Sequence, residues 1–229
     1  MSVIIAIDGP SGSGKSSTSR LVARRLGARY VDTGAMYRAI TWWMLREGID
    51  PDDTAAVAAR CAEPIIDLRD DPADPHISVD GHDVSVDIRG PGVGAAVSRI
   101  SAVPQVRSRL VAIQRDLVEA ARQRGDGVVM EGRDIGTVVL PDADLKVFLT
   151  ADAGARAERR AREQVGDDHV DRDMIRATEE HLLSRDAIDS TRAVSPLQAA
   201  DDAIRIDGTH LTLDEVADAI LAAVPDQRA

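Results

Sequence analysis

The sequence predicts an α/β protein with a parallel sheet that helices cover on both faces. Short apolar runs alternate along the chain with segments of helical pattern, as in parallel sheets whose strands are buried on both sides. A glycine-rich segment at 9–16 fits G-x-x-x-x-G-K-[ST] and directly follows the first apolar run. The order of strand, glycine-rich turn and helix is that of a phosphate-binding P-loop.

The first elements follow from local pattern. The continuously apolar run at 3–7 predicts a buried strand. A helix is expected over 16–26, with one apolar face and an end at Gly27. The segment 29–31 predicts a second strand, and 35–47 a second helix.

The second half of the chain repeats this alternation. A long helix is expected over 104–124, because apolar residues recur on one face, namely Val106, Leu110, Ile113, Leu117 and Ala121. Apolar runs at 128–130, 145–149 and 203–206 predict three more strands. A closing helix is expected over 212–224.

Two stretches interrupt the alternation. Residues 64–100 are rich in Pro, Asp and Gly, and 76–86 alternates at period two around an Asp-Gly pair, which predicts a hairpin. We expect a small, mostly β insert there. Residues 152–192 are dense in charge and helical in pattern, with a loop expected at 166–168.

Composition limits the function classes. The 229 residues carry a net charge of -11, which argues against nucleic-acid and acidic-membrane binding. Cys61 is the single cysteine, so an internal disulfide is excluded. The sequence shows no signal-peptide pattern and no apolar run long enough to span a bilayer. We therefore expect a cytoplasmic protein, and a monomer, since no exposed apolar stripe is evident.

The P-loop predicts binding of a nucleoside triphosphate. Glycines let backbone N–H groups turn inward, and the following helix adds the positive end of its dipole. Lys15 is expected on the β- and γ-phosphates, and the Ser16 hydroxyl on the nucleotide's Mg²⁺. The expected phosphate-binding set is Gly9, Pro10, Ser11, Gly12, Ser13, Gly14, Lys15, Ser16 and Ser17.

Several P-loop classes are excluded. A Ras-like GTPase needs an Asn-Lys-x-Asp segment, but only Lys15 and Lys146 are lysines, and Val147 and Phe148 follow the second. The Leu-Ser-Gly-Gly-Gln signature of ABC ATPases is absent, as is the strand ending in Asp-Glu of AAA motors. A small soluble kinase remains.

Four further motifs point to one kinase family. They are Asp-Thr-Gly-Ala-Met-Tyr-Arg at 32–38, Glu-Gly-Arg-Asp-Ile-Gly-Thr at 131–137, Ala-Arg-Ala-Glu-Arg-Arg at 155–160, and the segment 184–197. With the P-loop, they make the chain resemble the bacterial cytidylate kinases from residue 3 to about 224. Thr33 stands where that family often has Ser, and Glu131 where Asp is common; the role of Glu131 is left open.

The resemblance implies transfer of the γ-phosphoryl of ATP, with Mg²⁺, to CMP or dCMP. It also implies one kinase domain in three parts. The core would be 1–63, 101–150 and 193–229; the substrate-binding insert would be 64–100; a mobile lid and substrate-contacting region would be 151–192.

The resemblance also assigns residues. The acceptor phosphate is expected on Thr33, Arg38, Arg133 and Arg192, the cytosine on Ser98, Arg107 and Asp134, and the sugar hydroxyls on Arg185 and Asp189. Lid arginines Arg156, Arg159 and Arg160 would act on the phosphoryl group, so that the catalytic set is Lys15, Arg133, Arg156, Arg159, Arg160 and Arg192. No general base is assigned, because the acceptor phosphate is already an anionic nucleophile.

Some alternatives stay open. Arg156, Arg159 and Arg160 fall on one arc of a helix and could be a solvated face. Arg185 and Asp189 are four residues apart and could be a surface ion pair. The acceptor could be UMP, AMP or a sugar-like alcohol, or the chain could be a non-catalytic ATP-binding regulatory module.

Overall fold

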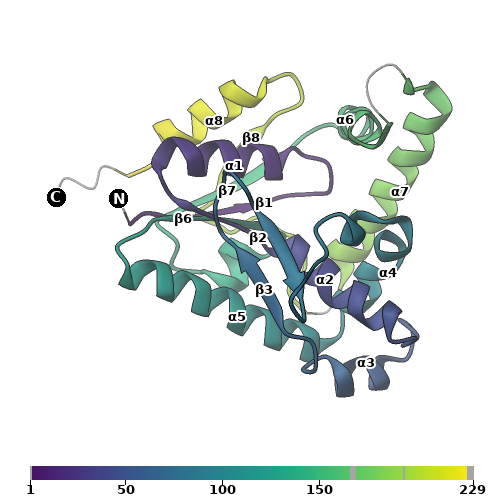
Figure 1. Cartoon of the computed structure of the whole chain (residues 1–229). Helices are drawn as coiled ribbons and strands as arrows, with labels where there is room; N and C mark the ends of the chain where they lie inside the picture. Colours follow the sequence, from purple (N-terminus) through teal and green to yellow (C-terminus); the bar gives the residue numbers. More distant parts are fainter. Residues whose placement is uncertain (1, 166–168, 193, 226–229) are drawn as a thin grey trace. The chain divides into compact units, whose positions relative to one another are not determined.

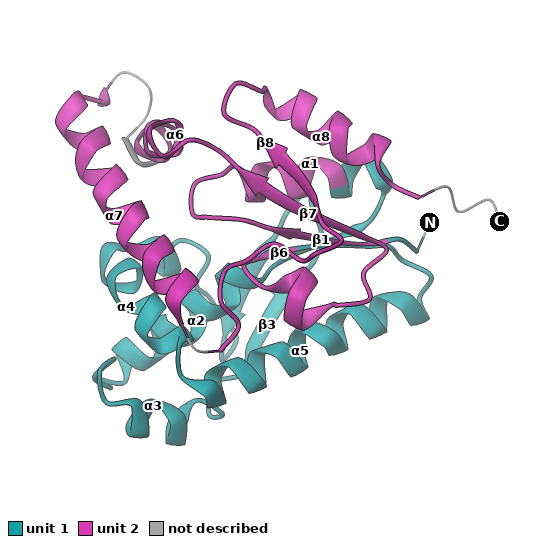
Figure 2. Cartoon of the chain, turned by 180° about the vertical axis from the view of Figure 1, so that it is seen from behind, with its two compact units in different colours: residues 1–3, 23–130 teal, residues 4–22, 131–229 magenta. Residues whose placement is uncertain are grey.

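The computed structural model describes residues 2–165, 169–192 and 194–225. The loop expected at 166–168 lies outside the described residues. The chain forms two compact units, which Figure 2 colours separately. The first unit is 1–3 with 23–130, and the second is 4–22 with 131–229.

The larger sheet confirms the predicted fold class. It contains β1 (Ile4–Asp8), β2 (Arg29–Asp32), β6 (Val128–Gly132), β7 (Leu145–Thr150) and β8 (Ile204–Asp207). Their order is β2-β6-β1-β7-β8, the sheet is mostly parallel, and helices flank it. Every residue of β1 and β6 is buried, which explains their continuous apolar pattern.

In the second unit, β1 and β8 both pair with β7 in parallel. Helix α1 (Lys15–Leu26) follows the P-loop, and α8 (Leu213–Ala222) lies beside it (Figure 1). A capping box formed by Thr212 and Glu215 begins α8.

The charge-dense stretch of the second unit forms two helices. Helix α6 (Ala153–Val165) packs against α7 (Arg172–Thr191). The carboxylate of Asp171 begins α7, because it accepts from the Met174 N–H at 2.8 Å. A π-helical turn at Ile135–Val139 follows β6 and was not expected.

The first unit is built around α2 (Thr33–Arg46) and α5 (Pro104–Gln123). Both helices contribute fully buried side chains to one apolar cluster, including Met36, Ile40 and Leu110. Ile77 of the small sheet belongs to the same cluster.

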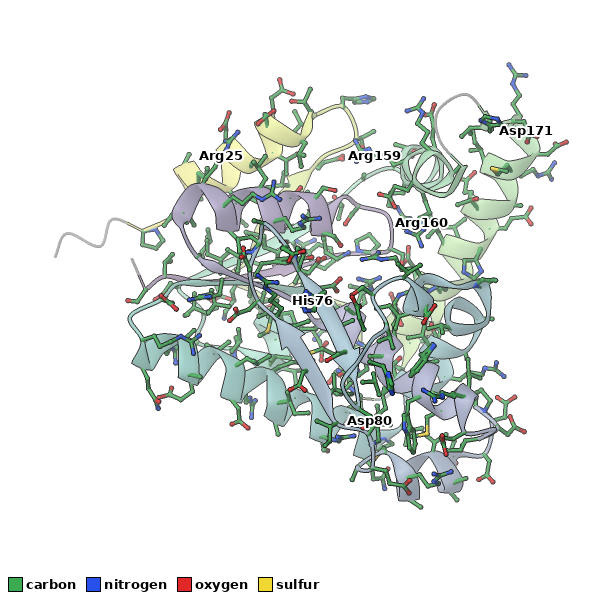
Figure 3. All side chains as sticks on the ribbon, viewed as in Figure 1. Arg25, His76, Asp80, Arg159, Arg160 and Asp171 are labelled. Carbon is green, nitrogen blue, oxygen red and sulfur yellow. The ribbon has the colours of Figure 1, made fainter. Side chains whose placement is uncertain are left out.

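The insert of the first unit is only partly β. An antiparallel sheet joins β3 (Ile66–Arg69), β4 (His76–Val79) and β5 (His82–Asp83). The predicted hairpin is confirmed, with Asp80 and Gly81 both at positive φ, 52° and 77° (Figure 3 labels His76 and Asp80). Strand β5 is shorter than the alternating pattern predicted.

Two helices of the first unit were not predicted. Helix α3 spans Thr54–Arg60, and α4 spans Pro91–Ser101, so the second half of the insert is helical rather than β. The two glycines in α4 concealed it, because glycine disfavours helices. Contact with α2 and burial of Val93, Val97 and Ile100 overcome that preference.

Helix α5 carries a buried amide that predicts a stabilising substitution. Gln114 is 0% exposed, and neither amide atom has a hydrogen-bond partner among the described residues. A buried polar group without a partner costs about 1–3 kcal/mol. We expect Gln114→Met, which keeps length and helix preference, to raise the free energy of unfolding by about 1–2 kcal/mol in urea titrations. The exposed Gln105 of the same helix is the control, since Gln105→Met should leave the free energy of unfolding unchanged. A destabilised Gln114→Met protein would contradict the prediction.

Candidate functional site

The P-loop backbone needs glycine at three positions. Gly9, Gly12 and Gly14 have φ values of 151°, 76° and 89°, which L side chains rarely adopt. A Cβ atom on Gly9 would also lie 2.0 Å from the Leu149 carbonyl oxygen. The first turn of α1 then leaves backbone N–H groups without helical acceptors, which favours a bound anion.

Lys15 is held inside this loop. Its side chain is buried, and Nζ donates to the Pro10 carbonyl at 2.7 Å and lies 3.5 Å from Ser13 Oγ. Burial and then the charge of Arg133 lower the pKa of Lys15 to about 7, against the effect of Glu131 and other carboxylates. An arriving phosphate would favour the charged amine.

Three side chains bind Ser11 of the loop. Arg133 Nη2 donates to Ser11 Oγ at 2.7 Å, and Arg156 Nη1 donates to the Ser11 carbonyl at 2.9 Å. The Ser11 N–H donates to Asp186 Oδ1 at 3.0 Å. Arg156 also forms an ion pair with Asp186 and donates to the Ala151 carbonyl. Residues far apart in the chain therefore fix one P-loop residue.

Asp8 anchors the segment that carries Arg133 and Asp134. Its two carboxylate oxygens accept from the N–H groups of Ile135 and Gly136, each at 2.8 Å. Burial raises the pKa of Asp8 to about 6, although both N–H donors oppose this. Sequence reasoning missed Asp8; the available signal was a carboxylate ending an otherwise apolar strand beside the P-loop.

Four predicted acceptor residues lie together in the second unit. Arg133 Nε donates to Asp189 Oδ2 at 3.2 Å. Arg192 Nη1 lies 3.7 Å from Asp189 Oδ1, and its Nη2 lies 3.9 Å from Asp134 Oδ1. Asp134, Asp189 and the Arg192 side chain are all buried. Buried charges need partners, so these ion pairs hold the group in place.

Arg185 lies one turn before Asp189 on α7. Burial, followed by the positive charge of Arg133, lowers its pKa. Its Nε is buried and has no hydrogen-bond partner in the described part of the chain. A fully exposed surface ion pair does not fit this burial of Nε.

The three α6 arginines that the sequence assigned to a lid have different partners. Arg156 contacts Ser11, as described above, whereas Arg159 Nη2 donates to the carbonyls of Gly208 and Thr209. Arg160 pairs with Glu163 at 2.9 Å (Figure 3 labels Arg159 and Arg160 on α6). A uniformly solvated face does not describe them.

The remaining predicted residues belong to the first unit. The Arg107 guanidinium lies over the Tyr37 ring, 5.4 Å from its centroid, and Nη1 donates to the Ser101 carbonyl at 3.4 Å. Ser98 is buried, and its carbonyl accepts from the Ser101 hydroxyl at 3.0 Å. Ser98 and Arg107 are therefore linked through Ser101.

Thr33 and Arg38 belong to α2 of the same unit. Thr33 is buried at the first residue of the helix, and the Asp32 carboxylate caps it by accepting from the Ala35 N–H at 2.9 Å. Arg38 Nη1 donates to the Ile88 carbonyl at 3.1 Å.

Across 2–165, 169–192 and 194–225, no group of three or more His, Cys, Asp or Glu residues is placed to hold a metal ion. Within the same ranges, no helix is long and apolar enough to cross a membrane.

Comparisons with known proteins point to the same family as the sequence motifs. The family model for cytidylate kinase matches residues 5–226. A cytidylate kinase of Streptomyces avermitilis is 53% identical over 99% of this chain and 94% of its own length, and one of Nocardia farcinica is 51% identical over 98% and 94%. An uncharacterized protein from Eubacterium ventriosum has a similar fold, with a TM-score of 0.51, 15% identity and 98% of both chains covered. The chain belongs to the cytidylate kinase family.

Proposed function

We propose that this protein transfers the γ-phosphoryl group of ATP to CMP or dCMP, giving ADP and the nucleoside diphosphate. The position of Arg133 supports this most directly, because its guanidinium contacts Ser11 of the P-loop and Asp189 of the predicted acceptor group. One cation thus adjoins both the donor loop and the acceptor residues. Charge spread over the transferring phosphoryl is stabilised by such a group.

The donor would occupy the P-loop. Backbone N–H groups and Lys15 would bind the phosphates of ATP. The Ser16 hydroxyl is exposed in the first turn of α1 and fits a ligand of Mg²⁺, which typically keeps several waters and the nucleotide's own phosphates. Bound Mg²⁺ would neutralise phosphate charge.

The acceptor would be CMP or dCMP. Arginine binds a dianionic phosphate with two parallel hydrogen bonds, and the family assigns Thr33, Arg38, Arg133 and Arg192 to it. Ser98, Arg107 and Asp134 would read cytosine, and Arg185 with Asp189 would bind the sugar. The Nε of Arg185, which has no hydrogen-bond partner among the described residues, supports this last assignment.

The lid arginines would have different roles, because their partners differ. Arg160 pairs with the exposed Glu163 and could exchange that weak partner for a phosphate. Arg159 instead donates to the carbonyls of Gly208 and Thr209. We assign residues 64–100 to substrate binding and residues 151–192 to the lid. We also propose that the protein is a cytoplasmic monomer.

A coupled assay of ADP formation tests the function. We expect rapid turnover with CMP and dCMP and far slower turnover with UMP, AMP and sugar alcohols. Lys15→Met purified in parallel controls for contaminating kinases. Tight ATP binding without ADP formation on any acceptor would indicate a regulatory module, and a preference for an alcohol would indicate another kinase class.

The pKa of Lys15 gives a prediction about pH. In the nucleotide-free protein, Lys15 should lose its proton around pH 7, because burial opposes the charge. Bound ADP should raise this pKa, so that Lys15 stays protonated through pH 8. Because the chain has two lysines, NMR of protein labelled with ¹³C at lysine Cε should give two signals, with Lys146→Arg assigning them. A Lys15 signal that does not titrate below pH 9 without nucleotide would contradict the prediction.

Asp134 should distinguish cytosine from uracil. Its carboxylate can accept a hydrogen bond from the C4 amino group of cytosine. In uracil it would instead face a lone pair of the C4 carbonyl oxygen. We expect Asp134→Asn to lower kcat/KM for CMP about tenfold or more and to narrow the CMP-to-UMP ratio by a similar factor. Steady-state kinetics with both nucleotides would measure this, with the exposed Asp142→Asn as control. An unchanged ratio in a folded mutant would mean that Asp134 does not read the base.

A further inference from the structure

We propose that Asp186 is a positioning residue that fixes the shape of the P-loop, and through it the affinity for the donor nucleotide. This inference rests on the proposed function of the loop in binding ATP. Asp186 lies on α7, 175 residues from the loop residue that it binds. It falls within the motif at 184–197, but the sequence assigned it no role.

The ion pair of Asp186 and Arg156 holds both backbone groups of Ser11. The carboxylate accepts the Ser11 N–H at 3.0 Å, and Arg156 Nη1 donates to the Ser11 carbonyl at 2.9 Å. The same Nη1 contacts the Asp186 carboxylate, which closes a ring of three interactions. The side chains of Asp186 and Arg156 are only 14% and 7% exposed, so water screens them little.

These contacts fix two successive peptide planes. In a trans peptide, the C=O and the following N–H point in opposite directions. The Pro10–Ser11 peptide is therefore held at both edges, since Lys15 Nζ donates to the Pro10 carbonyl at 2.7 Å and Asp186 accepts the Ser11 N–H. Arg156 holds the Ser11 carbonyl and thereby sets the direction of the Gly12 N–H.

Packing of α6 and α7 on the loop supports the same conclusion. A Cβ atom on Gly12 would meet the Arg156 carbonyl at 3.1 Å and Leu182 Cδ1 at 3.3 Å. Leu182 lies one turn before Asp186 on α7 and is buried. The helix that supplies the carboxylate is thus seated against the loop.

The geometry assigns Arg156 to the same task. Its Nε donates to the Ala151 carbonyl and its Nη1 to Ser11 and Asp186. A direct phosphate contact would be a separate contribution from the positioning role. The two roles predict different results for a double mutant. When two residues act through one network, the effect of mutating both is smaller than the sum of the two single effects, whereas the effects of mutating independent contacts add.

The experiment measures ADP binding by calorimetry for the full chain, Asp186→Asn, Arg156→Gln and the double mutant. Asparagine keeps the size of the side chain but turns an N–H donor toward Arg156. We expect Asp186→Asn to weaken ADP binding about tenfold or more, because a displaced loop loses several aligned donors. The double mutant should bind ADP within about threefold of the weaker single mutant.

Two controls separate positioning from general damage. Affinity for CMP should change less than about twofold in Asp186→Asn, because a merely unstable protein would lose both nucleotides. Glu180→Gln removes a carboxylate of an exposed arginine pair on the same helix and should leave ADP binding unchanged. If Asp186→Asn does not fold, Asp186→Glu, which keeps the charge but shifts it by one methylene, should weaken ADP binding with the same selectivity.

Unchanged ADP affinity in a folded Asp186 variant would overturn the inference, as would additive effects in the double mutant or an equal loss of CMP affinity. Failure of the unmodified chain to bind ADP would instead refute the proposed function. Binding of ADP without phosphorylation of CMP would also refute that function but would leave the test of Asp186 intact.

Discussion

The structure depends on burying positive charge around the P-loop before any nucleotide is present. Lys15, Arg156 and Arg192 are cations with little exposure, and each must find an acceptor within the protein. The aspartates at 134, 186 and 189 supply acceptors for the arginines. Lys15 instead donates to the Pro10 carbonyl, and its lowered pKa makes the neutral amine more accessible than in an exposed lysine.

This arrangement explains how an acidic chain can bind anions. The net charge of -11 repels a nucleotide at long range, so attraction must come from local groups. Paired arginines keep their side chains ordered, and a phosphate that replaces an aspartate as partner finds the donors already in place. In the proposed function, the pairs Arg133–Asp189 and Arg192–Asp134 would be of this kind.

Much of the fold could be predicted because its signals are local. Short segments, most of them apolar, identified the five strands of the larger sheet, and the Asp-Gly pair identified the hairpin. Helix α4 could not be predicted, because its glycines oppose helix formation and packing against α2 supplies the difference. The π-helical turn at Ile135–Val139 likewise depends on Asp8, which lies more than a hundred residues earlier.

The sequence suggests which residues form the site but does not show their contacts. Motifs single out the candidate arginines, but no local pattern shows which carbonyl a guanidinium will reach. Arg156 and Arg159 are three residues apart on α6, yet the first holds Ser11 and the second holds Gly208. The roles of Asp8 and Asp186 could not be predicted for the same reason, since their partners are backbone N–H groups elsewhere in the chain.

We infer that the protein's own ion pairs shape the P-loop in the absence of nucleotide. Amide hydrogen exchange of the Ser11 N–H, followed by NMR in the nucleotide-free protein, tests it most directly. We expect slow exchange at Ser11, whose N–H donates to Asp186, and fast exchange at Ser16 and Ser17 in the exposed first turn of α1. Fast exchange at all three, with protection of Ser11 only after ADP is added, would contradict it.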